Sequence, residues 1–427
     1  SGDKIRFEIT PINRHGERRS FYESGEGIVL TAVNMENKEN GFYRLSFGEH
    51  PRLELLYMGP YKFFWGGLRY GYTLSGGRYS DGYQPLKARD ADTWLVIKQS
   101  STEAPNCFIS KGLKTFTPLT QLQPYEDYNW LHSELINFKQ QDGSPSKGIL
   151  YKPENFDSSK KYPVLINYYE QFTMGLHQFL SVGYTPSAFI NIPWFVSRGY
   201  LVFLPDIYFN KENDDTKIAH GAAALNTVNG AANYLASLPY VDSARIGIAG
   251  HSTAGGLTNY ILTHSNRFAA VFEGAGVSDW VSSALQLNYR DGTSRLGASW
   301  YSGPTGSDIW TNNTKYLDNP ILHVGKVSSP LLMFHCKSDG PVPFEQAVEL
   351  FIAMRRMDKK AWLLQYDEGD HVQMNFRDEK DLTIRVTQFF DHYLKGSPPP
   401  VWMTSGVRAQ LKGIETGLEL DLSGRQP

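Results

Sequence analysis

Residues 245–262 read R-I-G-I-A-G-H-S-T-A-G-G-L-T-N-Y-I-L, and this stretch decides the fold. An apolar run ends at Gly-His-Ser and continues through small residues into a helical pattern. A chain presents a nucleophilic serine in this way, on a tight turn between a strand and a helix. Ser252 is the serine of this turn. The usual pattern is G-x-S-x-G, but Ala254 stands at its last position, which raises the question whether Ser252 is a working nucleophile.

Apolar runs in which apolar and polar residues do not strictly alternate precede and follow this turn in the sequence. They cover residues 162–169, 199–206, 244–250, 269–277, 330–336 and 361–367, with helical patterns between them at 222–238, 255–264, 344–357 and 380–394. Runs of this kind are typical of strands that are buried on both faces. Their alternation with helices predicts a doubly wound, mostly parallel sheet covered on both faces. A Pro-rich tail is expected to end the last helix at Gly396.

Two later loops supply the partners that a serine nucleophile needs. Asp339 follows the predicted strand at 330–336, and His371 follows the one at 361–367. A serine hydroxyl requires a base within hydrogen-bond reach and a third group that orients the base. The chain order Ser, Asp, His is that of an α/β-hydrolase, which is the fold predicted here. Asp279 also follows a strand and is the alternative acid, but we favour Asp339 because its loop continues into a helix.

The first part of the chain has a different pattern. Between residues 4 and 116, short alternating segments are separated by clusters of Gly, Asn, Asp and Pro, which predicts small antiparallel sheets. Residues 69–83 are rich in Tyr and Gly and are predicted to form a surface loop.

Composition excludes several classes of function. The 427 residues are 41% hydrophobic and 20% charged, and the formal net charge of −2 gives no general attraction to nucleic acid or anionic membranes. No apolar run is long enough to span a bilayer. The two cysteines, Cys107 and Cys336, permit a disulfide without demanding one.

Metal and nucleotide motifs are absent from the sequence, so no metal and no cofactor are predicted. The acidic segment 211–217 is interpreted as a solvated connection, and His264 and His392 as structural or surface groups. No targeting segment is recognisable, so periplasmic, secreted and cytoplasmic locations all stay open.

Several of these runs together resemble the prolyl oligopeptidase family, which includes dipeptidyl peptidase IV and acylaminoacyl peptidase. They are D-G-S-P-S-K-G-I-L-Y-K-P-E-N-F-D, Y-P-V-L-I-N-Y-Y, I-G-I-A-G-H-S, F-A-A-V-F-E-G-A-G-V-S-D-W, D-G-P-V-P-F and G-D-H, between about residues 126 and 395. The resemblance implies an α/β-hydrolase peptidase domain with a C-terminal tail at 126–427, and the last blades of a β-propeller at 1–125. A whole propeller needs at least four blades, so we expect a fragment of a longer chain.

The resemblance also assigns roles to individual residues. Ser252 matches the nucleophile, Asp339 the acid and His371 the base. The backbone N–H of Thr253 matches one oxyanion donor, because it follows the nucleophile. The hydroxyl of Tyr169 matches the second.

Tyr168 is the adjacent alternative to Tyr169, although the alternation of a strand points it the other way. It is also predicted, with Trp280 and Val342, to line a substrate pocket. At position 341 this chain has a proline, which cannot donate a hydrogen bond, where relatives that grip the substrate backbone have Asn or Arg. Proline specificity is therefore not carried over. Dipeptidyl cleavage also depends on an acidic propeller motif that this chain does not contain.

The predicted function is a serine peptidase that hydrolyses oligopeptides through an acyl-enzyme at Ser252, as an exopeptidase, dipeptidyl peptidase or oligopeptidase. One alternative is an esterase with the same triad. A second is a catalytically impaired relative that binds peptides. Four departures from the family pattern favour it: Ala254, Pro341, Thr253 where the family has an aromatic residue, and E-Q-F-T at 170–173 where it has a Gly-rich turn. The predicted partners are oligopeptide substrates, with no nucleic acid and no membrane span, and a homodimer is compatible with the sequence.

Overall fold

The computed structural model describes residues 4–9, 27–63, 85–185, 187–208, 220–287, 292, 310, 313–372, 375–411 and 413–427. The chain divides into two compact units. We call the first the β unit (Ser1–Leu135, Tyr151–Asn155 and Phe172–Ser181) and the second the α/β unit (Ile136–Leu150, Phe156–Gln171 and Val182–Pro427). The predicted loops at 69–83 and 211–217 lie outside the described residues. A domain boundary between residues 125 and 126 stays a prediction.

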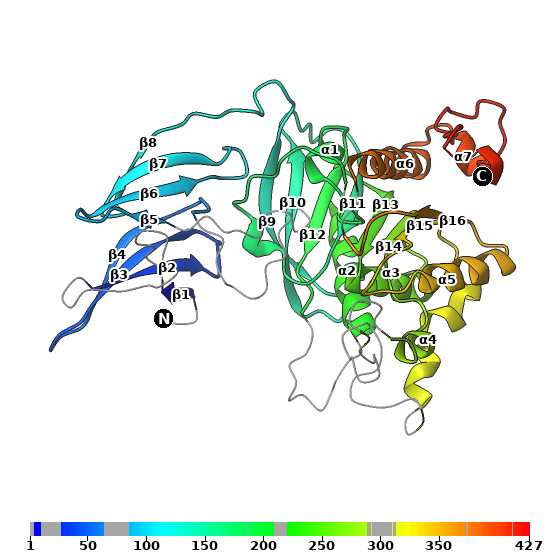
Figure 1. The fold of residues 1–427 in the computed structure, drawn as a ribbon, viewed down its shortest axis with the longest axis horizontal. Coiled ribbons are helices and arrows are strands. Elements are labelled where there is room, and N and C mark those ends of the chain that lie inside the picture. The colour runs from blue at the N-terminus through cyan, green and yellow to red at the C-terminus, as the bar shows by residue number, and fades with distance from the viewer. Residues whose placement is uncertain are drawn as a thin grey trace. The chain divides into compact units, whose positions relative to one another are not determined.

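The β unit contains two antiparallel four-stranded sheets within its described residues, which confirms the small antiparallel sheets expected there (Figure 1). The strands of the first sheet are β1 (Ile5–Ile9), β2 (Ile28–Asn34), β3 (Asn40–Ser46) and β4 (Arg52–Gly59). Those of the second are β5 (Leu86–Lys87), β6 (Thr93–Lys98), β7 (Asn106–Lys111) and β8 (Thr115–Pro118).

Alternation along the strands builds one apolar core in this unit. On β6, Trp94 and Val96 are buried while Leu95 between them is partly exposed, as expected for side chains that point to opposite faces of a sheet. Phe42 from the first sheet belongs to the same cluster, and Phe63 joins it with its ring centroid 5.2 Å from that of Phe42. The two sheets therefore share their buried side.

An eight-stranded sheet forms the centre of the α/β unit (Figure 1). Its strands are β9 (Leu131–Lys139), β10 (Pro145–Pro153), β11 (Tyr162–Asn167), β12 (Leu201–Pro205), β13 (Val241–His251), β14 (Ala270–Gly274), β15 (Leu331–Cys336) and β16 (Ala361–Tyr366). Their order is β16-β15-β14-β13-β11-β12-β10-β9, and the division between the units falls within β9 and β10. The strands β12, β11, β13, β14, β15 and β16 pair in parallel, each with the next in this order, and each lies within three residues of its predicted bounds. The parallel sheet is thereby confirmed.

Helices cover the sheet on both faces. They are α1 (Ile192–Val196), α2 (His220–Ser237), α3 (Thr253–His264), α4 (Trp280–Ala284), α5 (Glu345–Arg356), α6 (Phe376–Lys395) and α7 (Val401–Thr404). Short 3-10 helices are η1 (Thr173–Gly175), η2 (Asn313–Asp318), η3 (Pro320–Lys326) and η4 (Ala409–Leu411). Among the described residues, no helix combines the length and the apolarity needed to cross a bilayer.

The packing explains why the strand sequences are apolar throughout. Every residue of β11, β12, β14 and β15 is buried. On α6, Phe390 contacts Phe195 of α1 and Phe272 of β14, while α3 packs on β13 and β14 from the other face (Figure 1). Gly396, with φ of 74°, ends α6 in the left-handed conformation that glycine adopts at no steric cost. The helix therefore ends at the predicted residue.

The turn between β9 and β10 docks on α2. The side chain of Gln140 accepts a hydrogen bond of 2.5 Å from Thr227, and the amide of Asp142 donates to the side chain of Asn226 at 2.9 Å. Gly230, one turn further along α2, lies so close that a Cβ placed on it would sit 2.5 Å from Cα of Gln140. The absence of a side chain at position 230 therefore sets the distance between this turn and α2.

We expect Gly230→Ala to lower the free energy of unfolding by about 1–3 kcal/mol, because overpacking a close contact displaces backbone. Chemical denaturation followed by tryptophan fluorescence measures the change. Gly325→Ala on η3 is the matched control, since its new Cβ would lie 3.4 Å from the flexible end of Met357. Equal stability of the two variants would contradict the close packing at Gly230.

Candidate active site

Ser252 occupies a strained turn between β13 and α3. Its φ of 58° and ψ of −119° lie in a region that residues other than glycine rarely adopt. Two backbone hydrogen bonds hold the turn: the amide of Ser252 donates to Gly274 O at 2.8 Å, and the amide of Gly256 donates to Ser252 O at 3.0 Å. The turn brings the serine to the carboxyl end of β13, the end at which α/β sheets place their ligands.

Close backbone contacts explain which positions of the turn require glycine. A Cβ on Gly250 would lie 2.4 Å from Ala254 O, and a Cβ on Gly255 would lie 2.6 Å from Gly274 O. Ala254 itself is fully buried within α3, and its φ is not positive. Its methyl group is therefore accommodated, and the departure from G-x-S-x-G leaves the turn intact.

His371 lies between the serine and an aspartate. Its Nε2 is 2.6 Å from Oγ of Ser252, and its Nδ1 is 2.7 Å from Oδ2 of Asp339. Because a carboxylate only accepts, Nδ1 carries the proton and Nε2 is left to accept from the serine hydroxyl. The structure thus brings together the three residues that the sequence placed at three different strand ends. Asp279, the alternative acid, is used elsewhere, since its carboxylate accepts from the amides of Val281 and Ser282 at the start of α4.

A second histidine supports the aspartate. Nε2 of His335 is 2.9 Å from the carbonyl of Val342 and 3.2 Å from Oδ2 of Asp339, so this nitrogen carries a proton shared between two acceptors. Burial acts to raise the pKa of the Asp339 carboxyl, but hydrogen bonds from His335 and His371 outweigh it and hold that pKa below its usual range. Asp339 is therefore an anion at neutral pH. Sequence analysis missed His335, although its place at the end of β15 and four residues before Asp339 was a usable signal.

Asp370 joins the two loops that carry the acid and the base. Its carboxylate accepts from the amide of His371 at 2.8 Å and from the amide of Gly340 at 3.3 Å. The amide of Val342 in turn donates to Oδ1 of Asp339 at 2.7 Å. Backbone amides thus hold the carboxylates of Asp339 and Asp370 in place before any substrate binds.

The predicted oxyanion donors lie beside the serine turn. Thr253 is the first residue of α3, and the hydroxyl of Tyr169 lies 3.4 Å from its Oγ1. Tyr168 points the other way, as strand alternation predicted, and its hydroxyl is 2.6 Å from Thr258 Oγ1 inside the core. Of the two tyrosines, Tyr169 is therefore the one that lies beside the serine turn, and its role as an oxyanion donor stays a prediction.

The other predicted pocket residues are packed inside the unit. Trp280 and Val342 belong to a buried cluster with Tyr260 and Val277. The indole of Trp280 stacks on Tyr260 at a centroid distance of 6.2 Å. A role for Trp280, Val342 or Tyr168 in binding substrate stays a prediction.

His251, directly before the nucleophile, is a further residue that sequence reasoning did not single out. It is fully buried between Phe189 and Phe334, with its ring centroid 5.0 Å from that of His371. Burial lowers its pKa, and the neighbouring His371 lowers it further. His251 is consequently a neutral aromatic group on which the catalytic imidazole packs.

The comparison with family models agrees with this geometry. Residues 186–397 match the prolyl oligopeptidase family. The part of the chain that holds Ser252, Asp339 and His371 therefore matches a family of serine peptidases.

Curated proteins are similar to just over half of this chain. The uncharacterized peptidase YuxL of Bacillus subtilis is 26% identical over 252 residues, which are 56% of this chain and 35% of that protein. Dipeptidyl-peptidase 5 of Porphyromonas gingivalis is 26% identical over 245 residues, 55% of this chain and 34% of the relative. The matched part of the chain thus spans about a third of the length of these relatives.

Solved structures extend the similarity to the β unit. A putative dipeptidyl aminopeptidase IV from Bacteroides ovatus matches 92% of this chain with a TM-score of 0.66 and 18% identity, over 51% of its own length. The Pyrococcus horikoshii acylaminoacyl peptidase matches 90% with a TM-score of 0.59 and 17% identity, over 65% of its length. The fold is therefore an α/β hydrolase preceded by antiparallel β sheets, as in the propeller-bearing members of the family.

Glu273 is a buried carboxyl group beneath the serine turn. It is the fourth residue of β14, it is fully buried, and its Oε2 accepts from the amide of Gly276 at 3.1 Å. Burial raises its pKa from 4.5 to about 8, against the weaker effect of that hydrogen bond. The folded protein therefore holds a proton at Glu273 that the unfolded chain releases at a lower pH.

This difference predicts a pH-dependent stability. A carboxyl whose pKa is raised by folding favours the folded state below pH 4.5, and this contribution is lost as pH rises towards about 8. Glu273→Gln replaces the protonated carboxyl by a neutral amide of the same shape. Relative to this variant, we expect the wild-type protein to lose up to about 1.4 kcal/mol of unfolding free energy per pH unit in that window. Urea titrations at several pH values measure the difference, and parallel curves for the two proteins would contradict the raised pKa.

Proposed function

We propose that this chain carries the catalytic centre of a serine peptidase that hydrolyses peptide bonds of oligopeptides through an acyl-enzyme at Ser252. The observation that supports the proposal is the continuous line of hydrogen bonds from Oγ of Ser252 through His371 to Asp339, at 2.6 and 2.7 Å. This arrangement activates a hydroxyl that is otherwise a weak nucleophile.

Acylation begins when Oγ of Ser252 attacks the carbonyl carbon of the scissile bond. Nε2 of His371 accepts the hydroxyl proton, and the negative charge of Asp339 stabilises the resulting imidazolium. His371 then donates this proton to the departing amine as the bond between carbon and nitrogen breaks. A water molecule then attacks the carbonyl carbon of the ester that remains and gives its proton to Nε2 of His371. The bond between this carbon and Oγ of Ser252 breaks, the acid leaves, and His371 returns the proton to the serine.

Two donors stabilise the charge that develops on the carbonyl oxygen. The N–H of Thr253 lies at the start of α3, where the helix leaves its first amides available and carries a partial positive charge. The hydroxyl of Tyr169 approaches from the end of β11. Each donor of this kind lowers a barrier by about 3–4 kcal/mol.

The match to this family supports peptides as the substrate class. The names of the relatives, a dipeptidyl-peptidase and an acylaminoacyl peptidase, favour cleavage near the N-terminus of short peptides. The open position at Thr253, where the resemblance leads us to expect an aromatic side chain, favours a wider site for the residue before the cut.

A fluorophosphonate probe tests the nucleophile directly. We expect one covalent adduct per chain, located on Ser252 by peptide mapping and absent from Ser252→Ala. Asp339→Asn should slow labelling by about 10⁴-fold, because the amide holds the imidazole in the wrong tautomer.

Asp279→Asn is the matched control, since an asparagine still caps α4 and the labelling rate is expected to stay that of the wild-type protein. Labelling that is equally slow in both aspartate variants would contradict the assignment of the acid. Well-folded protein that forms no adduct at Ser252 would overturn the peptidase proposal and leave a peptide-binding relative.

The two adjacent tyrosines separate catalysis from stability. We expect Tyr169→Phe to lower kcat for p-nitrophenyl acetate hydrolysis by about 10²–10³-fold, because it removes an oxyanion donor and keeps the ring. Tyr168→Phe removes a buried hydroxyl bonded to Thr258 and should cost about 1 kcal/mol of stability while kcat is retained. Equal kcat values for the two variants would assign the second donor elsewhere.

A further inference from the structure

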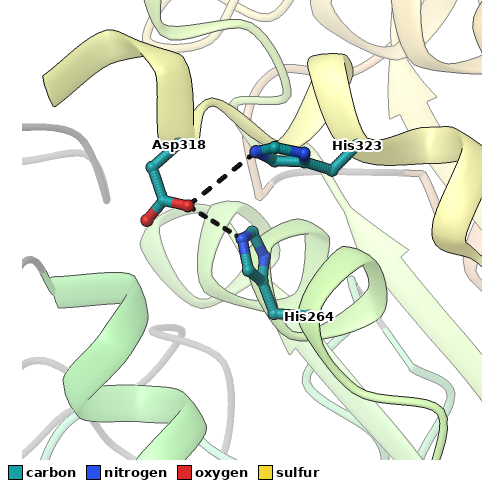
Figure 2. A group of neighbouring side chains, drawn as sticks. All are labelled: His264, Asp318 and His323. Carbon is teal, nitrogen blue, oxygen red and sulfur yellow. Dashed lines mark hydrogen bonds and ion pairs between the residues drawn. The ribbon is translucent and has the colours of Figure 1, made fainter. Parts of the chain in front are cut away.

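Two histidines and an aspartate meet at the end of α3 that lies away from Ser252 (Figure 2). His264 is the last residue of α3, Asp318 ends η2, and His323 lies in η3. Within the described residues, their ligand atoms all lie within 4.8 Å of one another. The 12 residues of α3 span about 18 Å, so this cluster is separate from the candidate active site.

The hydrogen bonds of His264 direct its second ring nitrogen at the carboxylate. Its Nδ1 lies 2.8 Å from the carbonyl oxygen of Tyr260 and 3.0 Å from Oγ1 of Thr263, whose hydroxyl donates to backbone carbonyls. Because the carbonyl of Tyr260 only accepts, Nδ1 carries a proton. Its Nε2 lies 2.9 Å from Oδ1 of Asp318 (Figure 2). In the neutral imidazole this places two acceptors face to face, an arrangement that is stable only with a cation between them. That cation is either a proton or a metal ion.

His323 favours the metal ion. Its Nε2 is directed at the same Oδ1 of Asp318, at 3.8 Å, and its ring crosses that of His264 edge to face at a centroid distance of 5.1 Å (Figure 2). A proton shared between His264 and Asp318 needs only these two partners, whereas a metal ion requires further ligands such as a second imidazole. Nε2 of His323 also lies 3.0 Å from the carbonyl of Leu317, so its proton must move to Nδ1 when a metal binds.

Tyr260 orients two of the three ligands. Its hydroxyl donates to Oδ2 of Asp318 at 2.7 Å, and its ring stacks on that of His264 at 4.0 Å and 10°. Burial, and then the hydrogen bond to Asp318, raise the pKa of this phenol, so the hydroxyl stays protonated and donates. Outer hydrogen bonds of this kind, from a carbonyl to a ligating histidine and from a hydroxyl to a ligating carboxylate, are usual around bound metals.

Charge and access also suit a cation. His264 lies in the last turn of α3, where the helix carbonyls carry a partial negative charge. The imidazole of His264 is 16% exposed and the carboxylate of Asp318 is 48% exposed. The protein ligands are therefore held on the buried side of the cluster. On the solvent side an ion can enter, and one coordination position is left for water.

We propose that His264, Asp318 and His323 form a zinc site. Two imidazole nitrogens and one carboxylate oxygen are donors that Zn²⁺ accepts, with water as the fourth ligand. Tetrahedral zinc bonds of about 2.0–2.1 Å place donor atoms about 3.4 Å apart. Oδ1 of Asp318 lies 2.9 Å from Nε2 of His264 and 3.8 Å from Nε2 of His323, on either side of this value. Only small side-chain movements are needed to bind the ion.

The proposed ion ties η2 and η3 to α3, and these residues in turn hold the start of α4. Asn319, directly after Asp318, accepts from the amide of Trp280 at 3.1 Å and donates to the carboxylate of Asp279 at 2.6 Å. Zinc at Asp318 therefore links η2 and η3 to the end of α3 and stabilises the cap of α4. The role is structural, so its test uses zinc binding and stability rather than catalysis.

Calorimetric titration of the chelator-stripped full chain with ZnCl₂ tests the site. We expect one Zn²⁺ per chain and a higher midpoint of thermal unfolding with zinc, because a ligand that binds only the folded state stabilises it. Asp318→Asn and His323→Ala should each weaken zinc binding by about 100-fold or more, and Tyr260→Phe, which keeps the stacked ring, by about 10–100-fold. MgCl₂ should bind weakly, since the site offers a single carboxylate.

His132→Ala is the control, because this exposed histidine lies outside the cluster and zinc affinity should be unchanged. Circular dichroism in the presence of chelator verifies that each variant is folded. Less than about one-tenth of a zinc ion per wild-type chain would overturn the proposal and leave a proton-bridged pair of His264 and Asp318. Zinc that remains bound in both Asp318→Asn and His323→Ala would overturn it as well, because the ion would lie elsewhere.

Discussion

The strained backbone of Ser252 is the constraint on which the rest of the α/β unit depends. A non-glycine residue with φ near 58° costs about 1–3 kcal/mol, and it persists only where the surroundings leave no alternative. Here β13 enters the turn in the middle of the sheet, and α3 leaves it with Gly255 packed against the end of β14 and against Gly276 just after it. Neither backbone has room for a Cβ at these two positions. The turn is therefore held by packing along its whole length, and the serine is positioned before substrate arrives.

The parallel order of the strands explains how His371 contacts residues that lie far apart in the chain. Parallel strands bring their carboxyl ends to one edge, so the loops after β15 and β16 lie beside the serine turn. Asp339 is anchored within its loop by the amide of Val342 and by His335, and Asp370 couples its loop to that of His371. With the acid fixed on one side, rotation of the imidazole is restricted to the orientation that meets Ser252.

Periodicity in the sequence was sufficient to predict the strands β11 to β16, the long helices α2, α3, α5 and α6, and the strand ends that carry Ser252, Asp339 and His371. It did not predict β9, β10 or the short helices α1, α4 and α7. Strands buried on both faces leave an unbroken apolar signal, and the chain order of the three residues follows from their strand ends. The supports were not predictable in this way. His335, Asp370 and Glu273 act through contacts that depend on side-chain direction and burial, which no local pattern records.

The cluster at the end of α3 could be predicted from the sequence even less well. His264, Asp318 and His323 are separated by 54 and 5 residues, and no metal motif has such spacing. They meet because η2 and η3 fold back on α3, and His264 acquires its direction from the carbonyl of Tyr260 one turn earlier. One helix thus begins at the strained nucleophile and ends at a site that needs a cation. The proposed ion joins η2 and η3 to the far end of α3, whereas the packing of Gly255 and Gly276 holds the turn at Ser252.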